Sequence, residues 1–523
     1  MTLSRREFLR LGLAGGAMLA LPFGLSACSS LGDAPMGNLL LSKTRLPKAF
    51  GVPLPVPPVL EPVRSDANVD YYEITQMVGN VEILPGKNTE VWGYNGIFPG
   101  PTIESRSGRK TVVRQTNGLP VPVSTHLHGG QTPPESDGYP TDLIMPRRAA
   151  HEMGGHGSME HMGSGHHYKD YSYPLEQRAA TLWYHDHRMD FTGPQVWRGL
   201  AGFHIVRDDE ENALPLPHGD KEVPLMICDR SFDADGSFLY PSLDPLLQGR
   251  PGVKREYMIG VLGDTILVNG APWPYLEVSN TKYRFRILNA SGARRYELAL
   301  DPEPSAGAPF VQIGSDGGLL GAPLSHRTIP IAQAERFDVV VDFSKYPVGA
   351  KVKLENRIGE DKTAEIMQFH VMRKENEESA IPKRLSDMSE YESLDESRAS
   401  LTRRFVFAQE RERNGMQIWT INGRVFDPSR IDARPRLGAS EIWELISGPA
   451  HPVHLHLVHF KVLSRNGRRP LPTDAGWKDT VALTTGERAR VIARFDGYLG
   501  RYVFHCHNLE HEDMMMMANF EVV

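Results

Sequence analysis

The chain carries three copies of one short pattern, and the first copy reads Tyr94-Asn95-Gly96-Ile97-Phe98-Pro99-Gly100-Pro101-Thr102-Ile103-Glu104. The second copy begins Val268-Asn269-Gly270, and the third begins Ile421-Asn422-Gly423. An Asn-Gly pair is typical of a tight turn between two strands. The pairs stand roughly 150 to 175 residues apart, which is the size of a domain and too long for a solenoid unit. The repeat therefore predicts three domains.

A strand pattern follows each copy of the repeat. Residues 111–117, 283–289 and 441–446 alternate in polarity and contain many β-branched and aromatic residues. A period of two with this composition predicts β-sandwiches. We therefore expect an all-β chain of three sandwich domains. The middle one differs, because it has Arg295-Tyr296-Glu297 where the outer two have His-x-His.

The predicted organisation has six parts. They are a signal segment over 1–28, an extended leader over 29–62, a first sandwich over 63–212, a second over 213–372, a linker over 373–400 and a third sandwich over 401–523. The leader contains six prolines between Pro47 and Pro62, so we expect it to lie outside every core. The linker is rich in Ser and Glu and is expected to cross the surface.

The composition agrees with a β-rich soluble protein. The 523 residues include 49 Gly and 40 Pro, which favour short strands and turns. The formal net charge of −6 leaves no basic excess to pair with phosphates, so no nucleic-acid partner is expected. Cysteine is scarce, with 3 residues, whereas there are 20 His and 19 Met. This bias toward nitrogen and thioether donors indicates metal binding.

The N-terminal segment predicts export. Arg5-Arg6 precedes an apolar, glycine-containing run over 11–25, which is typical of a twin-arginine signal. The run is shorter than the roughly 20 residues of a membrane span. It ends in Leu25-Ser26-Ala27-Cys28, which resembles a bacterial lipobox and makes Cys28 a candidate for lipidation; ordinary cleavage near Ala27 is the alternative. We expect a periplasmic or cell-surface protein, tethered to the membrane if Cys28 is lipidated.

Half of the histidines fall in four short motifs. The motifs are His126-Leu127-His128, His185-Asp186-His187, His451-Pro452-Val453-His454-Leu455-His456 and His505-Cys506-His507, with His511 following. Residues i and i+2 of a strand face the same side, so each His-x-His pair presents two imidazoles together. One such pair by itself would indicate a polar strand face. Four pairs predict a metal cluster surrounded by eight imidazoles.

The fourth motif implies a second metal site. Cys506 must point to the face opposite His505 and His507. Its thiolate, with His451, His511 and a weak axial thioether, makes the donor set of a blue-copper centre. We favour Met516 as the thioether, although the run Met514-Met515-Met516-Met517 leaves its neighbours open. Cys228 lies in an apolar run and is expected to be a buried small hydrophobe.

These motifs resemble those of three-domain multicopper oxidases, in the branch of the bacterial spore-coat laccases and bilirubin oxidases. The likeness extends over almost all of residues 45–523. Further stretches that carry it are Trp92-Gly93-Tyr94-Asn95-Gly96, Ser136-Asp137-Gly138-Tyr139-Pro140, Ile313-Gly314-Ser315-Asp316-Gly317-Gly318, Gly476-Trp477-Lys478-Asp479-Thr480 and His507-Asn508-Leu509-Glu510-His511-Glu512-Asp513.

The resemblance implies three cupredoxin-like Greek-key domains and four copper ions: one type 1, one type 2 and two type 3. It assigns His126 and His454 to the type 2 copper. By the same resemblance, the type 3 pair would be held by His128, His185, His187, His456, His505 and His507. The type 1 copper would be held by His451, Cys506, His511 and Met516. All twelve positions are filled.

Two acids match those that the family places beside its oxygen-reducing cluster. They are Asp137 and Glu512. Reduction of dioxygen to water consumes protons, so carboxylates placed near the cluster would act in proton delivery. The alternatives are a turn-forming aspartate in Ser136-Asp137-Gly138 and a solvated glutamate at 512.

A His- and Met-rich insert over 146–170 is the most individual feature of the chain. It interleaves Gly and Ser with the candidate accessory copper ligands His151, Met153, His156, Met159, His161, Met162, His166 and His167. This composition predicts a mobile insert without a packed core. It would recruit copper or receive Cu(I) as substrate, and the alternative is a solvated loop.

Three functions follow from these observations. The leading hypothesis is an oxidase that takes single electrons from phenols, aromatic amines or bilirubin-like molecules and reduces dioxygen to water. The second is a metal-ion oxidase that converts Cu(I), or alternatively Mn(II), for metal tolerance. The third is a non-catalytic copper-binding protein of the cell envelope, which would need no oxygen site. The expected partners are dioxygen and a small aromatic or metal-ion reductant, and the expected oligomeric state is a monomer.

Overall fold

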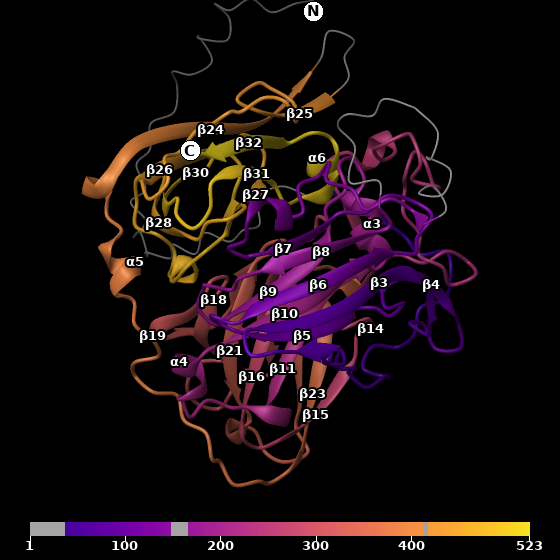
Figure 1. The fold of residues 1–523 in the computed structure, drawn as a ribbon. Helices are drawn as coiled ribbons and strands as arrows, with labels where there is room; N and C mark the ends of the chain where they lie inside the picture. The colour runs from indigo at the N-terminus through magenta and orange to yellow at the C-terminus, as the bar shows by residue number, and fades with distance from the viewer. Residues whose placement is uncertain (1–36, 148–165, 412–416) are drawn as a thin grey trace, which may run out of the picture. The chain divides into compact units, whose positions relative to one another are not determined.

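The computed structural model describes residues 37–147, 166–411 and 417–523. The signal segment, with Cys28, and most of the His- and Met-rich insert lie outside the described residues. Most described elements are strands, and in Figure 1 the chain passes from one group of sheets to the next in sequence order. Each group holds two sheets, as the predicted sandwich class requires.

The first group spans residues 64–207. One sheet has the order β2-β3-β6-β8, with β4 paired to β3, and the other has the order β5-β10-β9-β7. The bounds are β2 Arg64–Ser65, β3 Val69–Val81, β4 Thr89–Tyr94, β5 Gly100–Arg106, β6 Lys110–Asn117, β7 Thr125–His128, β8 Tyr168–Tyr173, β9 Ala180–Asp186 and β10 Ala201–Arg207. Strand β7 lies at the end of its sheet, and this places the first histidine motif at an edge.

The second group follows over residues 222–373. Its sheets have the orders β14-β13-β11-β16-β21-β18-β19 and β15-β23-β22-β17-β20. The bounds are β11 Glu222–Arg230, β13 Thr265–Val268, β14 Ala271–Pro272, β15 Tyr275–Ser279, β16 Lys282–Asn289, β17 Tyr296–Asp301, β18 Phe310–Ser315, β19 Gly318–His326, β20 Ile329–Ile331, β21 Arg336–Asp342, β22 Lys351–Asn356 and β23 Glu365–Arg373. Aromatic side chains such as Phe285, Phe343 and Phe369 fill the core between the two sheets.

The third group begins at Ala399. Its sheets have the orders β25-β24-β26-β30-β28 and β29-β27-β31-β32. The bounds are β24 Ala399–Arg411, β25 Gln417–Ile421, β26 Ser440–Ser447, β27 His451–Leu455, β28 Phe460–Arg465, β29 Thr480–Leu483, β30 Arg488–Arg494, β31 Gly500–Cys506 and β32 Met517–Val522. The short helices among the described residues are α3 Thr192–Arg198, α4 Asp209–Asn212, α5 Ser389–Ser393 and α6 Leu509–Asp513.

The repeated Asn-Gly pairs are turns, as predicted. Asn95 and Gly96 have φ values of 57° and 69°, and the second and third pairs have 50° and 83°, and 53° and 71°. Positive φ at both central residues defines the type I′ turn, which only Gly and Asn adopt at low cost. The strands expected after each turn are also present, as β6, β16 and β26.

The expectation that the leader lies outside every core is wrong for its described part. Leu54 is buried in the core of the second group, and its backbone N–H donates to the carbonyl of Tyr275. Upstream, β1 (Asn38–Leu40) pairs in parallel with β12 (Val261–Gly263). Prolines cannot donate to a sheet, but the residues between them still pair and bury their side chains.

Two further expectations concern single segments. Cys228 is a buried residue of an apolar cluster, as predicted. The stretch expected to be a linker is mostly exposed, and Leu385 and Leu394 anchor it in two small apolar clusters. No helix in the described part of the chain is long and apolar enough to cross a membrane. The domain boundaries drawn from the sequence stay predictions.

Candidate metal centres

Two pairs of antiparallel strands carry the four histidine motifs. In β7 and β9, His126 lies directly opposite His185, and in β27 and β31, His454 lies opposite His505. In Figure 1, β27 and β31 lie directly above β7. The Nε2 atoms of His126 and His454 are 3.4 Å apart. The first and third sandwiches therefore meet at their histidines.

The structure brings all eight imidazoles of these motifs into one buried cluster. Nε2 of His505 lies 3.3 Å from Nε2 of His187 and 3.2 Å from Nε2 of His456. The ring of His507 lies between the rings of His128 and His185, with centroids 5.0 and 5.3 Å away. Groups of three possible ligand atoms within 4.8 Å of one another form around these contacts: His126, His454 and His456; His126, His128 and His185; and His187, His456 and His505.

Hydrogen bonds on the outer side of the cluster orient the rings. Nδ1 of His126 and Nδ1 of His185 donate to the backbone carbonyls of Asp137 and Asp186, at 2.6 and 2.8 Å. Nδ1 of His454 donates to the carbonyl of Asp479 at 2.9 Å. A histidine that binds a metal through one nitrogen usually donates its other N–H in this way.

The inner nitrogens show that the rings fit a bound metal. Nδ1 of His128, Nε2 of His185 and both ring nitrogens of His507 are buried without a hydrogen-bond partner among the described residues. A buried polar atom without a partner is costly, and a bound cation removes that cost. Burial lowers the pKa of His185 to about 3, and lowers that of His187, with help from neighbouring rings, to about 4. The neutral imidazole is the form that binds metal.

The second donor set lies on the other face of β31. The Sγ atom of Cys506 is 3.2 Å from Nδ1 of His451 and 3.5 Å from Nδ1 of His511, and these two nitrogens are 3.1 Å apart. Met516 is buried in the same apolar cluster, and its carbonyl accepts a hydrogen bond from the Cys506 N–H. Burial raises the pKa of the Cys506 thiol, so a thiolate here needs a metal cation beside it. The alternation expected for His505-Cys506-His507 is thus present.

The ring of His511 is enclosed. Its Nε2 donates to the carbonyl of Ile259 at 3.2 Å, and the indole of Trp419 stacks on it with centroids 3.6 Å apart. Trp419 in turn donates from Nε1 to the carbonyl of Met258 at 3.2 Å. His511 is only 2% exposed. The backbone at 258–259 and one aromatic ring therefore cover the type 1 donor set at this histidine.

Both candidate acids are buried beside the eight-ring cluster. The Oδ2 of Asp137 accepts from Nδ1 of His456 at 2.7 Å, while its Oδ1 has no hydrogen-bond partner within the described residues. Burial raises the pKa of Asp137 well above its usual value. Glu512, in α6, lies 3.2 Å from Nδ1 of His505 and 3.7 Å from Nε2 of His187. A solvated glutamate at 512 is therefore excluded.

Asp479 is a residue of the site that the sequence did not single out for a role. Its Oδ1 accepts from Nε2 of His128 at 3.0 Å, and its carbonyl accepts from His454. The contact depends on the pairing of β29 with β27, which sets Thr480 opposite His454. A charged Lys478-Asp479 pair directly before the apolar strand Thr480–Leu483 was the available signal, since charges next to a buried strand need partners.

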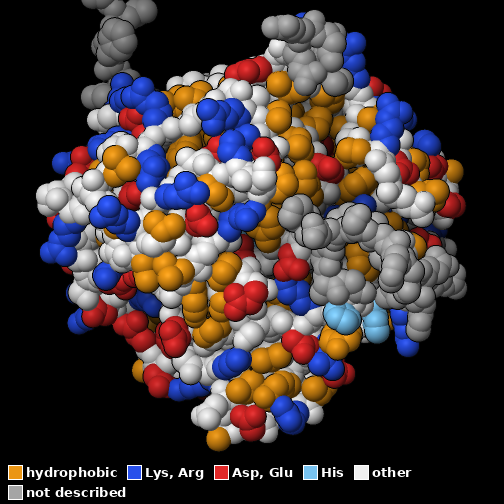
Figure 2. Space-filling model, turned by 45° about the horizontal axis from the view of Figure 1, so that its top comes forward, with side chains coloured by type: hydrophobic (Ala, Val, Ile, Leu, Met, Phe, Trp, Pro, Cys, Tyr) orange, Lys and Arg blue, Asp and Glu red, His pale blue; other side chains and the backbone are white. Residues whose placement is uncertain are grey.

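Most of the proposed accessory copper ligands lie outside the described residues. The exceptions are His166 and His167, which precede β8. Their backbone carbonyls accept from Met145 and Asn117, and His166 is exposed. On the face drawn in Figure 2, histidine side chains come to the surface at one place, among interspersed acidic, basic and apolar side chains.

Comparison with known proteins gives a consistent result. Two family models described as multicopper oxidase match residues 398–523, and 76–152 with 144–211. A laccase of Bacillus subtilis (strain 168) is 37% identical, over 90% of this chain and 97% of its own length. A bilirubin oxidase of Albifimbria verrucaria is 35% identical, over 90% of this chain and 81% of its own length. The crystal structure of a laccase from Pediococcus acidilactici Pa5930 superposes with a TM-score of 0.77 at 32% identity, covering 92% of this chain and 96% of that one.

Proposed function

Because this chain belongs to the multicopper oxidase family, we propose that it is an exported oxidase of small aromatic reductants. Phenols, aromatic amines or bilirubin-like molecules would give up electrons one at a time near His511. The electrons would reduce dioxygen to water at the eight-histidine cluster. The two curated relatives described above, a laccase and a bilirubin oxidase, support this class of reductant.

One observation carries the proposal. His505 and His507 are the sequence neighbours of Cys506 at the end of β31. One peptide bond on each side therefore links the donor set around Cys506 to a ring of the eight-ring cluster. A protein that only stored copper would have no need for this connection or for eight converging rings. The backbone from Cys506 to its neighbours gives a short covalent route for electrons between the two sites.

The residues present fit the four coppers of the family. His451, Cys506 and His511 would hold the type 1 ion, with Met516 as the fourth donor that we propose. His126 and His454 would hold the type 2 ion, and the remaining six rings the type 3 pair. When bound, the four ions supply the four electrons that convert one dioxygen into two waters. The chain itself keeps the rings neutral, orients them through Asp137 and Asp479, and excludes water from the cluster by burial.

Proton supply is the part of the reaction that we assign to carboxylates. Glu512 lies against His505 and His187, and Asp137 lies on the side of His126 and His456. Each carboxyl is within hydrogen-bond reach of a ring that faces the cluster. We propose that Asp137 and Glu512 hold and release the protons that dioxygen takes up.

A second candidate function is favoured by the enclosure of His511. Its Nε2 is already bonded to the Ile259 carbonyl, and Trp419 covers the ring face. A large organic molecule cannot contact this nitrogen unless the segment at 258–259 moves, whereas a small cation needs far less space to approach. Oxidation of Cu(I) for copper tolerance is therefore the alternative.

The cell location and the insert belong to the proposal as well. The twin-arginine pattern supports export to the periplasm or cell surface, and Cys28 supports a lipid tether; mass spectrometry of the mature N-terminus tests both. We propose that the insert over 146–170 handles copper. Its deletion should slow Cu(I) oxidation or copper loading, and unchanged rates of both would refute this role.

Oxygen uptake by the copper-loaded protein separates the candidate functions. A phenolic dye and bilirubin should each drive oxygen consumption, with water rather than peroxide as the product. Uptake with Cu(I) alone would assign the protein to metal-ion oxidation. No uptake with any reductant, despite full copper loading, would leave a non-catalytic copper-binding protein.

A further inference from the structure

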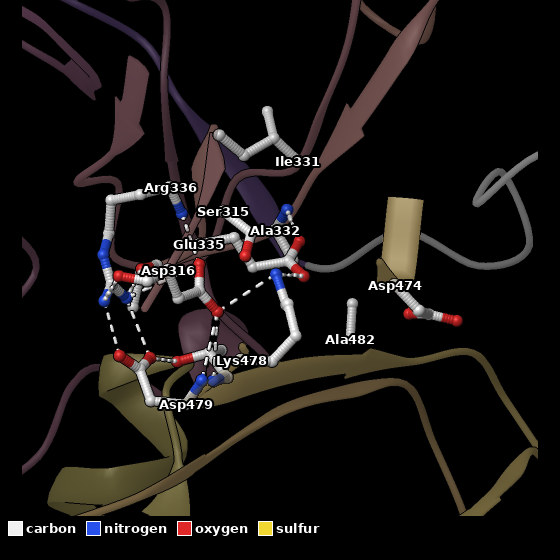
Figure 3. A network of polar contacts seen from close by, with 12 residues as sticks. Ser315, Asp316, Ile331, Ala332, Glu335, Arg336, Asp474, Lys478, Asp479 and Ala482 are labelled. Atoms are coloured by element: carbon white, nitrogen blue, oxygen red, sulfur yellow. Dashed lines mark hydrogen bonds and ion pairs between the residues drawn. The ribbon is translucent and has the colours of Figure 1, made fainter. Parts of the chain in front are cut away.

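A buried network of charged side chains joins the middle sandwich to the eight-ring cluster. Figure 3 shows Arg336 and Asp479 facing each other. Lys478 extends toward Glu335, and Asp316 lies between the arginine and the lysine. Arg336 and Asp316 belong to the second group of sheets, whereas Lys478 and Asp479 precede β29 of the third. All five side chains are buried. The network therefore lies where a sandwich without histidine motifs meets one that has them.

The Arg336 guanidinium has every N–H engaged. Nη1 donates to Oδ1 of Asp479 at 2.8 Å, and Nη2 donates to Oδ2 of the same carboxylate. Nε donates to the carbonyl of Thr181 at 2.9 Å, and the remaining two hydrogens go to the carbonyls of Ala334 and Asp316. A guanidinium has five donors in a rigid plane, so five acceptors fix its position and its orientation.

The residue whose carboxylate Arg336 holds bonds to two rings of the cluster, one through its side chain and one through its backbone. Asp479 accepts from Nε2 of His128 through Oδ1 and from Nδ1 of His454 through its backbone carbonyl. With its proton on Nε2, His128 keeps Nδ1 as a free lone pair, and that atom has no other partner in the part of the chain described. Arg336 also contacts β9, the strand of His185, by its hydrogen bond to the Thr181 carbonyl.

The rest of the network holds the Asp479 backbone. Asp316 accepts from the N–H groups of Asp479 and Thr480 at 3.2 and 3.3 Å, and from Nζ of Lys478 at 3.0 Å. Lys478 also lies 3.1 Å from Oε1 of Glu335. Buried ion pairs often contribute little net stability, because both charges lose their hydration. Stability alone therefore does not account for the network. Its three carboxylates and two cations leave an excess of negative charge, which suits the edge of a cationic metal cluster.

We infer that Arg336 is a positioning residue of the oxygen-reducing site. It clamps the Asp479 carboxylate so that His128 presents Nδ1, and His454 presents Nε2, toward the metal. The middle sandwich, which lacks histidine motifs, thus takes part in building the cluster between its two neighbours. The inference rests on the proposed function, through the assignment of His128 and His454 as copper ligands.

The chain supplies a matched control for Arg336. Arg286, in the adjacent strand β16, is equally buried and bonds to Glu222 and Glu211, both at 2.6 Å. It also touches β9 at Thr181, through the side-chain hydroxyl at 2.9 Å. Its polar contacts within the described residues include no candidate ligand. Arg286→Lys therefore imposes a similar disturbance on the fold without reaching the cluster.

The test compares Arg336→Lys and Arg286→Lys with the wild-type holoenzyme. We expect Arg336→Lys to keep the blue absorbance of the Cys506 site while its affinity for the trinuclear coppers falls about 10- to 100-fold. Copper content, the near-ultraviolet absorbance of the type 3 pair and the electron paramagnetic resonance of the type 2 ion report this loss. The rise in Tm on adding copper to the apoprotein should shrink for Arg336→Lys and stay at the wild-type size for Arg286→Lys.

Four outcomes are distinguishable. An unchanged trinuclear signature and an unchanged copper-dependent rise in Tm in Arg336→Lys would overturn the inference. If this variant fails to fold, the isosteric Asp479→Asn replaces it, because it leaves Arg336 its three carbonyl acceptors. We expect Asp479→Asn to show the same selective loss of the trinuclear coppers. Full trinuclear loading in Asp479→Asn would overturn the inference. A wild-type protein that binds copper but consumes no oxygen would refute the proposed function, whereas a wild-type protein without a trinuclear signature would remove the ligand assignment too.

Discussion

At the scale of single residues, Cys506 has the most consequential position. Its thiol faces His451 and His511, while the residues on either side face the eight-ring cluster. We expect Cys506→Ser to abolish the blue absorbance and to lower oxidase activity more than about 100-fold, because a serine hydroxyl does not replace a thiolate ligand. Visible spectra and oxygen uptake check this.

Cys228 supplies the control for that substitution. It is the other cysteine among the described residues and is equally buried, but it lies in an apolar cluster of the second sandwich region. Cys228→Ser should retain the blue colour and the activity. Activity that survives in Cys506→Ser would contradict the assignment of the type 1 site.

Glu512 is the residue for which a proton-transfer role is most directly testable. Its carboxylate reaches His505 and His187 from α6. Glu512→Gln keeps the shape and removes the carboxyl group that binds and releases a proton, so oxygen reduction should slow by about 100-fold or more while the blue absorbance stays. Glu510→Gln, two residues earlier in the same helix, should leave oxygen reduction close to the wild-type rate. Loss of colour in Glu512→Gln would instead indicate a structural role.

His204 predicts a pH dependence of stability. It is fully buried, donates to Ser105 at 2.9 Å, and burial lowers its pKa to about 3. In the unfolded chain its pKa is about 6.5. Between these values the unfolded state binds the extra proton, so the free energy of unfolding falls by about 1.4 kcal/mol per unit as the pH drops below 6.5. His204→Gln should unfold with a shallower dependence on acid, measured by urea titrations at several pH values.

A substitution at an exposed histidine tests whether the change in pH dependence is specific to His204. His218 is exposed, and His218→Gln should keep the wild-type slope. An unchanged slope in His204→Gln would show that this imidazole is not the group responsible.

At the scale of the element, the leader shows what a local sequence pattern predicts and what it misses. Its prolines lie in no named strand, although Pro53 forms an isolated bridge with Tyr275, and Leu54 enters a core that forms from residues more than 150 positions later. We expect Leu54→Ala to lower the free energy of unfolding by about 2 to 3 kcal/mol, because it leaves a cavity. Val56→Ala, at a position that is 55% exposed in the same segment, should change it by less than about 0.5 kcal/mol. Equal effects in urea unfolding would contradict the anchoring role of Leu54.

The strands and turns themselves were largely predictable, for a physical reason. Alternation along a strand and positive φ at Asn-Gly are properties of a few adjacent residues. The faces of His505, Cys506 and His507 follow from the same period of two. In contrast, the role of Asp479 depends on which strand lies beside β29, and no local pattern contains that information.

At the scale of the whole molecule, the cluster unites two distant parts of the chain. The rings of β7 and β9 meet those of β27 and β31 across more than 300 positions of sequence. A ligand that binds only the folded arrangement stabilises it by mass action, by about 2.7 kcal/mol at a concentration one hundred times Kd. We expect copper removal to lower Tm by about 2 to 3 °C for each ion bound at that concentration, measured by calorimetry.

Reloading provides the control for copper removal. Cu(II) added to the apoprotein should restore Tm, whereas Mg²⁺, which prefers oxygen ligands, should not. The same Tm before and after removal would contradict a metal site that bridges the first and third sandwiches.

The sequence by itself determined the class of fold, the three Asn-Gly turns and the types of donor atoms available, because these depend on neighbouring residues and on composition. Only the tertiary structure decided which rings share a site, that Leu54 joins a core, and that Ile259 and Trp419 cover His511. Only the tertiary structure, too, set Arg336 against Asp479 behind His128. These contacts join residues far apart in the chain, and their partners are chosen by sheet pairing and packing rather than by any local pattern.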